Sequence, residues 1–197
     1  MIVFKNISKL KPFMILNQKY HKAISKKQSS PEIICISSYD PKKNEVNSRY
    51  VNLKIIDNEE FIFFTNYNST KSKEFFLHNQ ISALIYWESI NLQIRMKAKI
   101  VKKSIEFNEN YFLTRSPEKN ALAISSKQSN IVESFDIVKK KYKKALLEED
   151  LTNCPDYWGG FSFTPFEIEF WEGNKFRINK RDLFIQNEEW KHFILEP

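Results

Sequence analysis

The sequence predicts an α+β fold, in which an antiparallel β-barrel carries helices inserted between its strands. Three observations lead to this prediction. At least five segments alternate apolar and polar residues or concentrate β-branched and aromatic residues, as strands do. Helical patterns interrupt these segments at intervals. Apolar residues make up 42% of the 197 residues, which favours one folded domain, residues 1–197, with a substantial core.

The first part of the chain, residues 1–30, is predicted to be a helical segment. Residues 8–27 have a helical pattern with lysines facing outward, and Ser8 is available as an N-cap. Residues 31–197 are predicted to form the barrel. Its first strands are expected at 33–37, 48–56, 60–66, 81–87 and 92–103.

Four helices are expected between and after these strands, at 68–79, 105–114, 118–126 and 131–149. A meander of strands then closes the fold, at 160–173, 175–181, 183–186 and 190–195. If the second of these is a strand, Arg177, Asn179 and Arg181 share one of its faces, because side chains alternate along a strand.

The net charge of +7 indicates an anionic partner, such as nucleic acid, a membrane surface or a phosphorylated small molecule. The lysine run at 139–144 is interpreted as a solvated helix face. No apolar run approaches the roughly 20 residues of a membrane-spanning helix. Lysines interrupt every apolar patch of the N-terminus, which makes a poor signal peptide, so we expect a cytoplasmic protein.

Several kinds of site are excluded by residue usage. The only glycines are Gly159, Gly160 and Gly173, so no glycine-rich phosphate loop is possible, and arginine and lysine side chains must bind any phosphate. Two cysteines and three histidines show no zinc spacing, and no metal site is expected. No serine lies in a G-x-S-x-G nucleophile motif.

A series of motifs appears in order along the chain: SRYVNLK (48–54), FFTNYNSTK (63–71), LQIRMKA (92–98), NYFLTRS (110–116), SKQSN (126–130) and YWGGFSFTPFEIEFWEGNKFRINKR (157–181), with Trp190, Leu195 and Pro197 near the end. By these motifs the chain resembles the pyridoxamine 5′-phosphate oxidases, FMN-dependent enzymes of vitamin B6 metabolism. The resemblance runs from about residue 31 to the C-terminus.

The resemblance implies an FMN-binding split barrel of six to eight antiparallel strands with surrounding helices. It also implies a homodimer with FMN at the subunit interface, and no nucleic-acid or membrane partner. The implied reaction converts pyridoxamine 5′-phosphate or pyridoxine 5′-phosphate to pyridoxal 5′-phosphate. Hydride passes to the flavin, and O₂ reoxidises the flavin to give H₂O₂.

Carried over by position, the resemblance implies a cofactor site built from both subunits. Arg49 and Lys71 would neutralise the FMN phosphate, with Ser69 close by. The full implied set is Arg49, Tyr50, Val51, Asn52, Leu53, Lys54, Phe64, Thr65, Ser69, Thr70, Lys71, Gln93, Gln128, Ser129, Trp171 and Arg181.

For the substrate, the resemblance implies that Lys54, Tyr111 and Arg115 bind the 5′-phosphate. Lys119 and Asn179 are also expected at the substrate. Arg177 would lie over the pyridine ring as the catalytic residue, near the carbon that loses hydride.

The chain departs from the family pattern at several of these positions. Thr70 stands where an arginine is usual, Lys119 where a serine is usual, and Asn179 and Lys180 where histidine and aspartate are usual. The N-terminal arm before the first helix is also short. Two alternatives therefore stay open: a related flavoenzyme with another substrate, such as a phenazine-pathway oxidase, and a non-catalytic flavin- or B6-binding protein.

Overall fold

Six antiparallel strands close into a barrel in the computed structural model, which describes residues 1–197. β3 pairs with β2, β2 with β5, β5 with β6 and β6 with β7, and β4 closes the ring by pairing with both β7 and β3. β8 and β9 extend the sheet beyond β7, and β1 lies parallel to β3. The predicted α+β split barrel is confirmed. The assignment of residues 1–197 to one domain stays a prediction.

The strands are β1 (Val3–Lys5), β2 (Ile33–Asp40), β3 (Glu45–Asp57), β4 (Glu60–Asn66), β5 (Gln80–Trp87), β6 (Leu92–Lys102), β7 (Trp158–Glu172), β8 (Lys180–Gln186) and β9 (Trp190–Leu195). The helices are α1 (Lys11–Ser25), α2 (Thr70–Leu77), α3 (Ile105–Leu113), α4 (Pro117–Ser125) and α5 (Phe135–Glu148), with a 3₁₀ turn at η1 (Glu88–Ile90). None of the helices combines the length and the apolar character needed to cross a lipid bilayer.

Phenylalanines from β4 and β7 fill the barrel. Phe61 stacks on Phe163 at a ring-centroid distance of 5.0 Å, and Phe63 lies 6.1 Å from Phe161. Burying an aromatic side chain of this size stabilises the fold by about 1.5–3 kcal/mol. The alternation that predicts β6 from the sequence is seen in its burial, since every second side chain from Leu92 to Ile100 is buried.

The N-terminal segment differs from its prediction in two ways. The helix begins at Lys11 with Leu10 as the N-cap residue. The Ser8 hydroxyl accepts a hydrogen bond from the Leu10 amide and lies two residues before the N-cap position, so it does not cap the helix. Residues 3–5 form β1, which the sequence did not indicate because three residues are too few to show alternation. α1 then covers the barrel, with Phe13 edge-on to Trp190.

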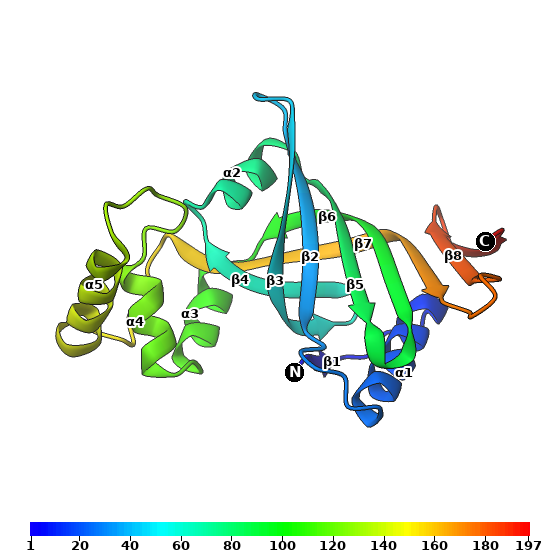
Figure 1. Ribbon diagram of the computed structural model, residues 1–197. Coiled ribbons are helices and arrows are strands. Elements are labelled where there is room, and N and C mark those ends of the chain that lie inside the picture. Colours follow the sequence, from blue (N-terminus) through cyan, green and yellow to red (C-terminus); the bar gives the residue numbers. More distant parts are fainter.

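The other helices lie close to their predicted ranges. The largest shift is at α5, which begins at Phe135 rather than residue 131. The reason is a local cap, since the Ser134 hydroxyl accepts a hydrogen bond from the Ile137 amide. Figure 1 shows α3, α4 and α5 together on one side of the barrel, while β8 and the C-terminus project from the opposite side.

Candidate functional site

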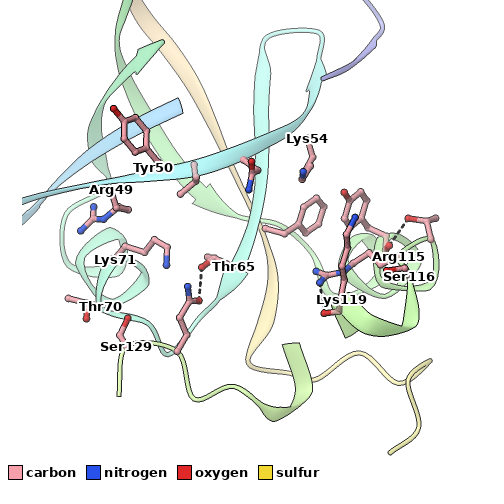
Figure 2. Close-up of a pocket in the computed structure, with 16 residues that line it drawn as sticks. Arg49, Tyr50, Lys54, Thr65, Thr70, Lys71, Arg115, Ser116, Lys119 and Ser129 are labelled. Atoms are coloured by element: carbon pink, nitrogen blue, oxygen red, sulfur yellow. Dashed lines mark hydrogen bonds between the residues drawn. The ribbon is translucent and has the colours of Figure 1, made fainter. Parts of the chain in front are cut away.

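A pocket of about 850 Å³ opens between β3, β4, the start of α2 and the turn that joins α3 to α4. Most of its lining consists of residues predicted from the sequence. The lining residues are Arg49, Tyr50, Val51, Asn52, Lys54, Phe64, Thr65, Thr70, Lys71, Tyr111, Thr114, Arg115, Ser116, Lys119, Gln128 and Ser129. Figure 2 shows that its cationic side chains form two groups, with Arg49 and Lys71 at one end and Lys54, Arg115 and Lys119 at the other. We call these groups the first and the second cationic pole.

The first pole combines an ion-paired arginine with a buried lysine. Arg49, on β3, pairs with Glu74 of α2 at 2.8 Å. Lys71 is only 9% exposed, and its ammonium donates a hydrogen bond to the Ser69 hydroxyl at 3.1 Å. Burial, helped by the neighbouring Arg49 charge, lowers the pKa of Lys71 to about 8. An anion bound at this pole would offset both the cost of burying the Lys71 charge and its repulsion with Arg49.

The start of α2 adds backbone donors to the same pole. Ser69 is the N-cap residue, but its side chain does not cap the helix. Its hydroxyl instead bonds Lys71 and Ser72. The first N–H groups of a helix have no intrahelical partner and favour an anion, so Thr70 and Lys71 can bind a phosphate through the main chain. Thr70, where the resemblance would place an arginine, thus still offers a main-chain donor.

At the second pole, Arg115 is held from two sides. Its guanidinium stacks on the Trp158 indole at 4.2 Å and donates a hydrogen bond to the Lys119 carbonyl at 2.7 Å. Burial lowers the pKa of Arg115. Burial also lowers the pKa of Lys54; the charge of Glu32 partly offsets this effect, and the charges of Lys119 and Arg115 add to it.

No carboxylate lies within ion-pair distance of the cations of the second pole. None of the ion pairs of the structure includes Lys54, Arg115 or Lys119. The Nε of Arg115 is buried without a hydrogen-bond partner. Three mutually repelling cations in one hollow therefore present positive potential that an anionic ligand can neutralise.

The wall between the poles is aromatic and amide-rich. Phe64 of β4 stacks on Tyr111 of α3, with ring centroids 3.6 Å apart and planes within 7°. Burial raises the pKa of Tyr111, so its phenol stays neutral and can donate a hydrogen bond. Gln128 is fixed beside this wall, because its side-chain oxygen accepts from the Thr65 hydroxyl and from the Asn66 amide, each at 3.2 Å.

Two glycines allow β7 to approach the helices that bear the second pole. A Cβ at Gly159 would overlap the Tyr67 hydroxyl and the Asn108 amide. Asn108 of α3 accepts a hydrogen bond from the Gly160 amide at 2.8 Å and donates one to Tyr67 at 2.8 Å. These contacts attach α3 directly to the barrel, which explains physically why the sequence has consecutive glycines after Trp158.

Two predicted cofactor residues lie beneath the pocket surface. Leu53 is fully buried in the barrel core, so only its backbone can face a ligand. Ser69 is fully buried below Lys71 and acts on the pocket through that lysine.

Three further predicted residues, Gln93, Trp171 and Arg181, lie side by side in a separate row across β6, β7 and β8. Gln93 is in register with Trp171, and Trp171 with Arg181. Glu169 of β7 accepts a hydrogen bond from Arg181 Nε at 2.7 Å. None of the three lines the pocket of its own chain. We call them the strand row.

The predicted strand over 175–181 is wrong. β8 begins only at Lys180, and residues 174–179 form a loop in which Arg177 has a left-handed φ of 62°. The Asn179 side-chain oxygen accepts a hydrogen bond from the Asn174 amide at 3.1 Å, and the Arg177 amide donates to the Asn174 carbonyl at 2.9 Å. Arg177 and Asn179 therefore do not share a strand face with Arg181, and neither lines the pocket of its own chain. The alternation misled because Phe176 and Ile178 are exposed rather than packed.

The sequence reasoning missed Thr114 and Ser116, which line the second pole. A signal was present for Ser116, because a serine directly before a proline is typical of a helix start, and Ser116 is the N-cap residue of α4. Glu74 carried no such signal, since nothing in the sequence distinguishes it from an exposed helical glutamate.

The family comparison matches the end of the chain. A family model described as "Pyridoxine 5′-phosphate oxidase C-terminal dimerisation region" matches residues 158–197. Among curated proteins, the pyridoxine/pyridoxamine 5′-phosphate oxidase of Paraburkholderia xenovorans (strain LB400) is 31% identical over 190 residues. The match covers 94% of this chain and 89% of that protein.

Two solved structures share the fold. PhzG from Burkholderia lata 383, solved in complex with tetrahydrophenazine-1-carboxylic acid, has a TM-score of 0.90 and is 22% identical, covering 95% of this chain and 93% of its own. A pyridoxamine 5′-phosphate oxidase-related, FMN-binding protein from Nostoc punctiforme PCC 73102 has a TM-score of 0.77 and is 14% identical, covering 96% of this chain and 99% of its own.

Proposed function

Because the chain belongs to the pyridoxine/pyridoxamine 5′-phosphate oxidase family, we propose that it is an FMN-dependent oxidase that forms pyridoxal 5′-phosphate. The substrate is pyridoxamine 5′-phosphate or pyridoxine 5′-phosphate, and O₂ is the electron acceptor, giving H₂O₂. The observation that carries the proposal is the pair of cationic poles at opposite ends of one pocket. Such a pocket suits two ligands that each carry a phosphate and lie between the poles.

The first pole fits the phosphate of FMN. Arg49 can form charge-assisted hydrogen bonds to the phosphate, and Lys71 adds a point charge beside the first turn of α2. Thr65, Gln128 and Ser129 offer polar groups along the pocket wall. When bound, FMN supplies the hydride acceptor, so the protein needs no nucleophile or acid–base pair of its own.

The second pole fits the 5′-phosphate of the substrate. Arg115 and Lys54 bind the anion, and Lys119 adds a third charge where the family pattern has a hydroxyl. The Tyr111 phenol donates a hydrogen bond, while its stack on Phe64 gives a flat apolar surface and excludes water. Anchoring the phosphate fixes the distance of the substrate ring from the cofactor, and positioning of this kind lowers the barrier.

A homodimer would complete the site. Gln93, Trp171, Arg177 and Arg181 do not reach the pocket of their own chain. The matched dimerisation region, residues 158–197, includes the last three of them. We infer that these side chains enter the pocket of the partner subunit, where Arg177 acts at the substrate ring and the strand row at the cofactor. Asn179 supports the Arg177 loop in this arrangement.

A second candidate is a related flavoenzyme acting on a different substrate. The structural similarity to PhzG and the departures at Thr70, Lys119 and Asn179 favour keeping it. The three cations of the second pole favour a phosphorylated substrate over one with a single carboxylate. The cytoplasmic location expected from the sequence stays a prediction.

A steady-state assay with added FMN tests the proposal. Pyridoxamine 5′-phosphate and pyridoxine 5′-phosphate are each supplied in air-saturated buffer, and pyridoxal 5′-phosphate and H₂O₂ are measured. We expect equal amounts of the two products. If the purified protein binds flavin but turns over neither substrate, the proposal is wrong, and the second candidate or a non-catalytic binder replaces it.

A further inference from the structure

A buried carboxylate lies directly behind the first cationic pole. Glu74, in the middle of α2, is only 1% exposed and does not line the pocket. Its carboxylate accepts hydrogen bonds from Arg49 Nη2 at 2.8 Å, from Asn47 Nδ2 at 2.9 Å and from the Ser38 hydroxyl. Through these hydrogen bonds the Glu74 side chain connects α2 to β2 and β3.

These contacts fix one edge of the Arg49 guanidinium. Nη2 bonds Glu74, while Nη1 donates to the Ser38 hydroxyl and, at 3.4 Å, to the Ile36 carbonyl. The remaining N–H groups of the guanidinium are left for a ligand, and Arg49 lines the pocket beside Lys71 and Thr70. The planar guanidinium cannot turn without breaking several of these bonds.

Stabilisation of the fold is by itself a weak explanation for the buried Glu74–Arg49 pair. A buried ion pair loses much of its Coulomb attraction to desolvation, and apolar replacements are often as stable. A fixed guanidinium is valuable where the oxygens of an anionic ligand must be bound in one orientation, because the ordering is completed before binding. Glu74 also offsets the repulsion between Arg49 and Lys71, since its charge raises the pKa of Lys71, which burial and the charge of Arg49 lower.

We propose that Glu74 is a positioning residue, which holds Arg49 in the orientation that binds the phosphate of the flavin cofactor. The proposal rests on the proposed FMN function. It assigns no contact between Glu74 and the ligand. It concerns the phosphate alone, so it distinguishes FMN from riboflavin, which has the same ring and ribityl chain without the phosphate.

The test measures the dissociation constants of FMN and riboflavin for the apoprotein by quenching of flavin fluorescence. Glu74→Gln keeps the size of the side chain and removes its charge. We expect it to weaken FMN binding about tenfold, a typical loss when a supporting residue behind a ligand-binding group is changed. Riboflavin binding should change less than about twofold, within the scatter of unrelated substitutions.

Glu60→Gln is the matched control. Glu60 pairs with Lys103 at 2.7 Å and does not line the pocket, so this variant also removes one carboxylate from one ion pair. We expect it to keep both affinities. Ser38→Ala is a second test, because the Ser38 hydroxyl contacts both Arg49 and Glu74. It should give the same selective loss for FMN even if Glu74→Gln does not fold.

A double-mutant cycle shows whether the effect passes through Arg49. In an Arg49→Ala background, Glu74→Gln should cause no further loss of FMN affinity. The proposal is overturned if Glu74→Gln leaves FMN affinity unchanged or increases it, if riboflavin affinity falls equally, or if the two substitutions add. If the wild-type protein binds FMN no more tightly than riboflavin, the FMN proposal falls as well.

Discussion

The first cationic pole and the strand row each contain an arginine paired with a buried carboxylate, but the two arginines lie in different surroundings. At the first pole, Glu74 pairs with Arg49, and the arginine lines a pocket formed within one chain. In the strand row, Glu169 pairs with Arg181 at 2.7 Å, but this arginine does not line the pocket. Each arginine is held by a buried carboxylate, yet only the first lines the pocket formed within its own chain. This difference is the reason for the proposal that the strand row acts in the site of a partner subunit.

The largest effects should separate a residue that binds the cofactor from one that acts on the substrate. Arg49→Ala should lower FMN affinity about a hundredfold, the loss expected for hydrogen bonds to a charged group. Arg177→Ala should lower kcat/KM about a hundredfold and leave the flavin content unchanged, because a group acting on the reacting atoms stabilises mainly the transition state. Flavin absorbance per protein and steady-state rates check both.

Arg49→Lys is the matched control, because it keeps the charge opposite Glu74 and loses only the planar geometry. Equal loss of flavin in Arg49→Ala and Arg177→Ala would contradict the division of roles between these two arginines.

A mixing experiment tests whether the two regions meet across a dimer. Arg49→Ala and Arg181→Ala should each be nearly inactive alone. In a mixed dimer, one site has lost both arginines, while the other keeps Arg49 from one chain and Arg181 from the other. Random re-pairing should therefore restore about a quarter of wild-type activity, because half of the dimers are mixed and each has one intact site. Mixtures that stay inactive would place the strand row outside the partner's site.

FMN affinity should depend on pH to an intermediate extent, and this dependence should come from the first pole. The pKa of Lys71, lowered to about 8 by burial and by Arg49, means that the lysine is charged below this pH and neutral above it. The charged form binds the phosphate, whose own second pKa is about 6, so FMN affinity should be greatest near pH 7 and fall up to about tenfold per pH unit above about pH 9. FMN titrations across this range measure the effect.

The control for the pH dependence is Lys71→Arg, which keeps its charge throughout the range and should show no such fall. Arg49 and Glu74 are the charged groups that influence Lys71. A riboflavin affinity that falls in parallel would mean that the titrating group does not act on the phosphate.

The smallest effect should come from the loop that carries Arg177. Asn179→Ala removes the acceptor of the Asn174 amide and should lower turnover about threefold, because one exposed hydrogen bond contributes roughly 0.5–1.5 kcal/mol. Asn179→Asp keeps an acceptor oxygen and should restore most of the rate. If the Asp variant is as slow as the Ala variant, the Asn179 amide acts on the substrate directly rather than through the loop.

Much of the pocket could be predicted because its residues lie in short, ordered motifs. The segment from Arg49 to Lys54 and the segment from Phe64 to Lys71 reach the pocket on adjacent strands, so their resemblance to a family carries over position by position. The Arg177 loop was mispredicted because alternating residues look the same in a strand and in an exposed turn. Only the left-handed backbone and the Asn174–Asn179 hydrogen bond distinguish the two.

The sequence by itself determined most of the strand and helix order and the kind of cation that must bind phosphate, because these depend on local periodicity and on residue type. Its resemblance to a family, carried by ordered motifs, implied the split-barrel class and most of the pocket lining. Only the tertiary structure decided that Glu74 is buried behind Arg49, that Lys71 is desolvated and that the strand row lies apart from the pocket. These properties depend on which distant segments pack together, and burial and charge pairing arise from that packing.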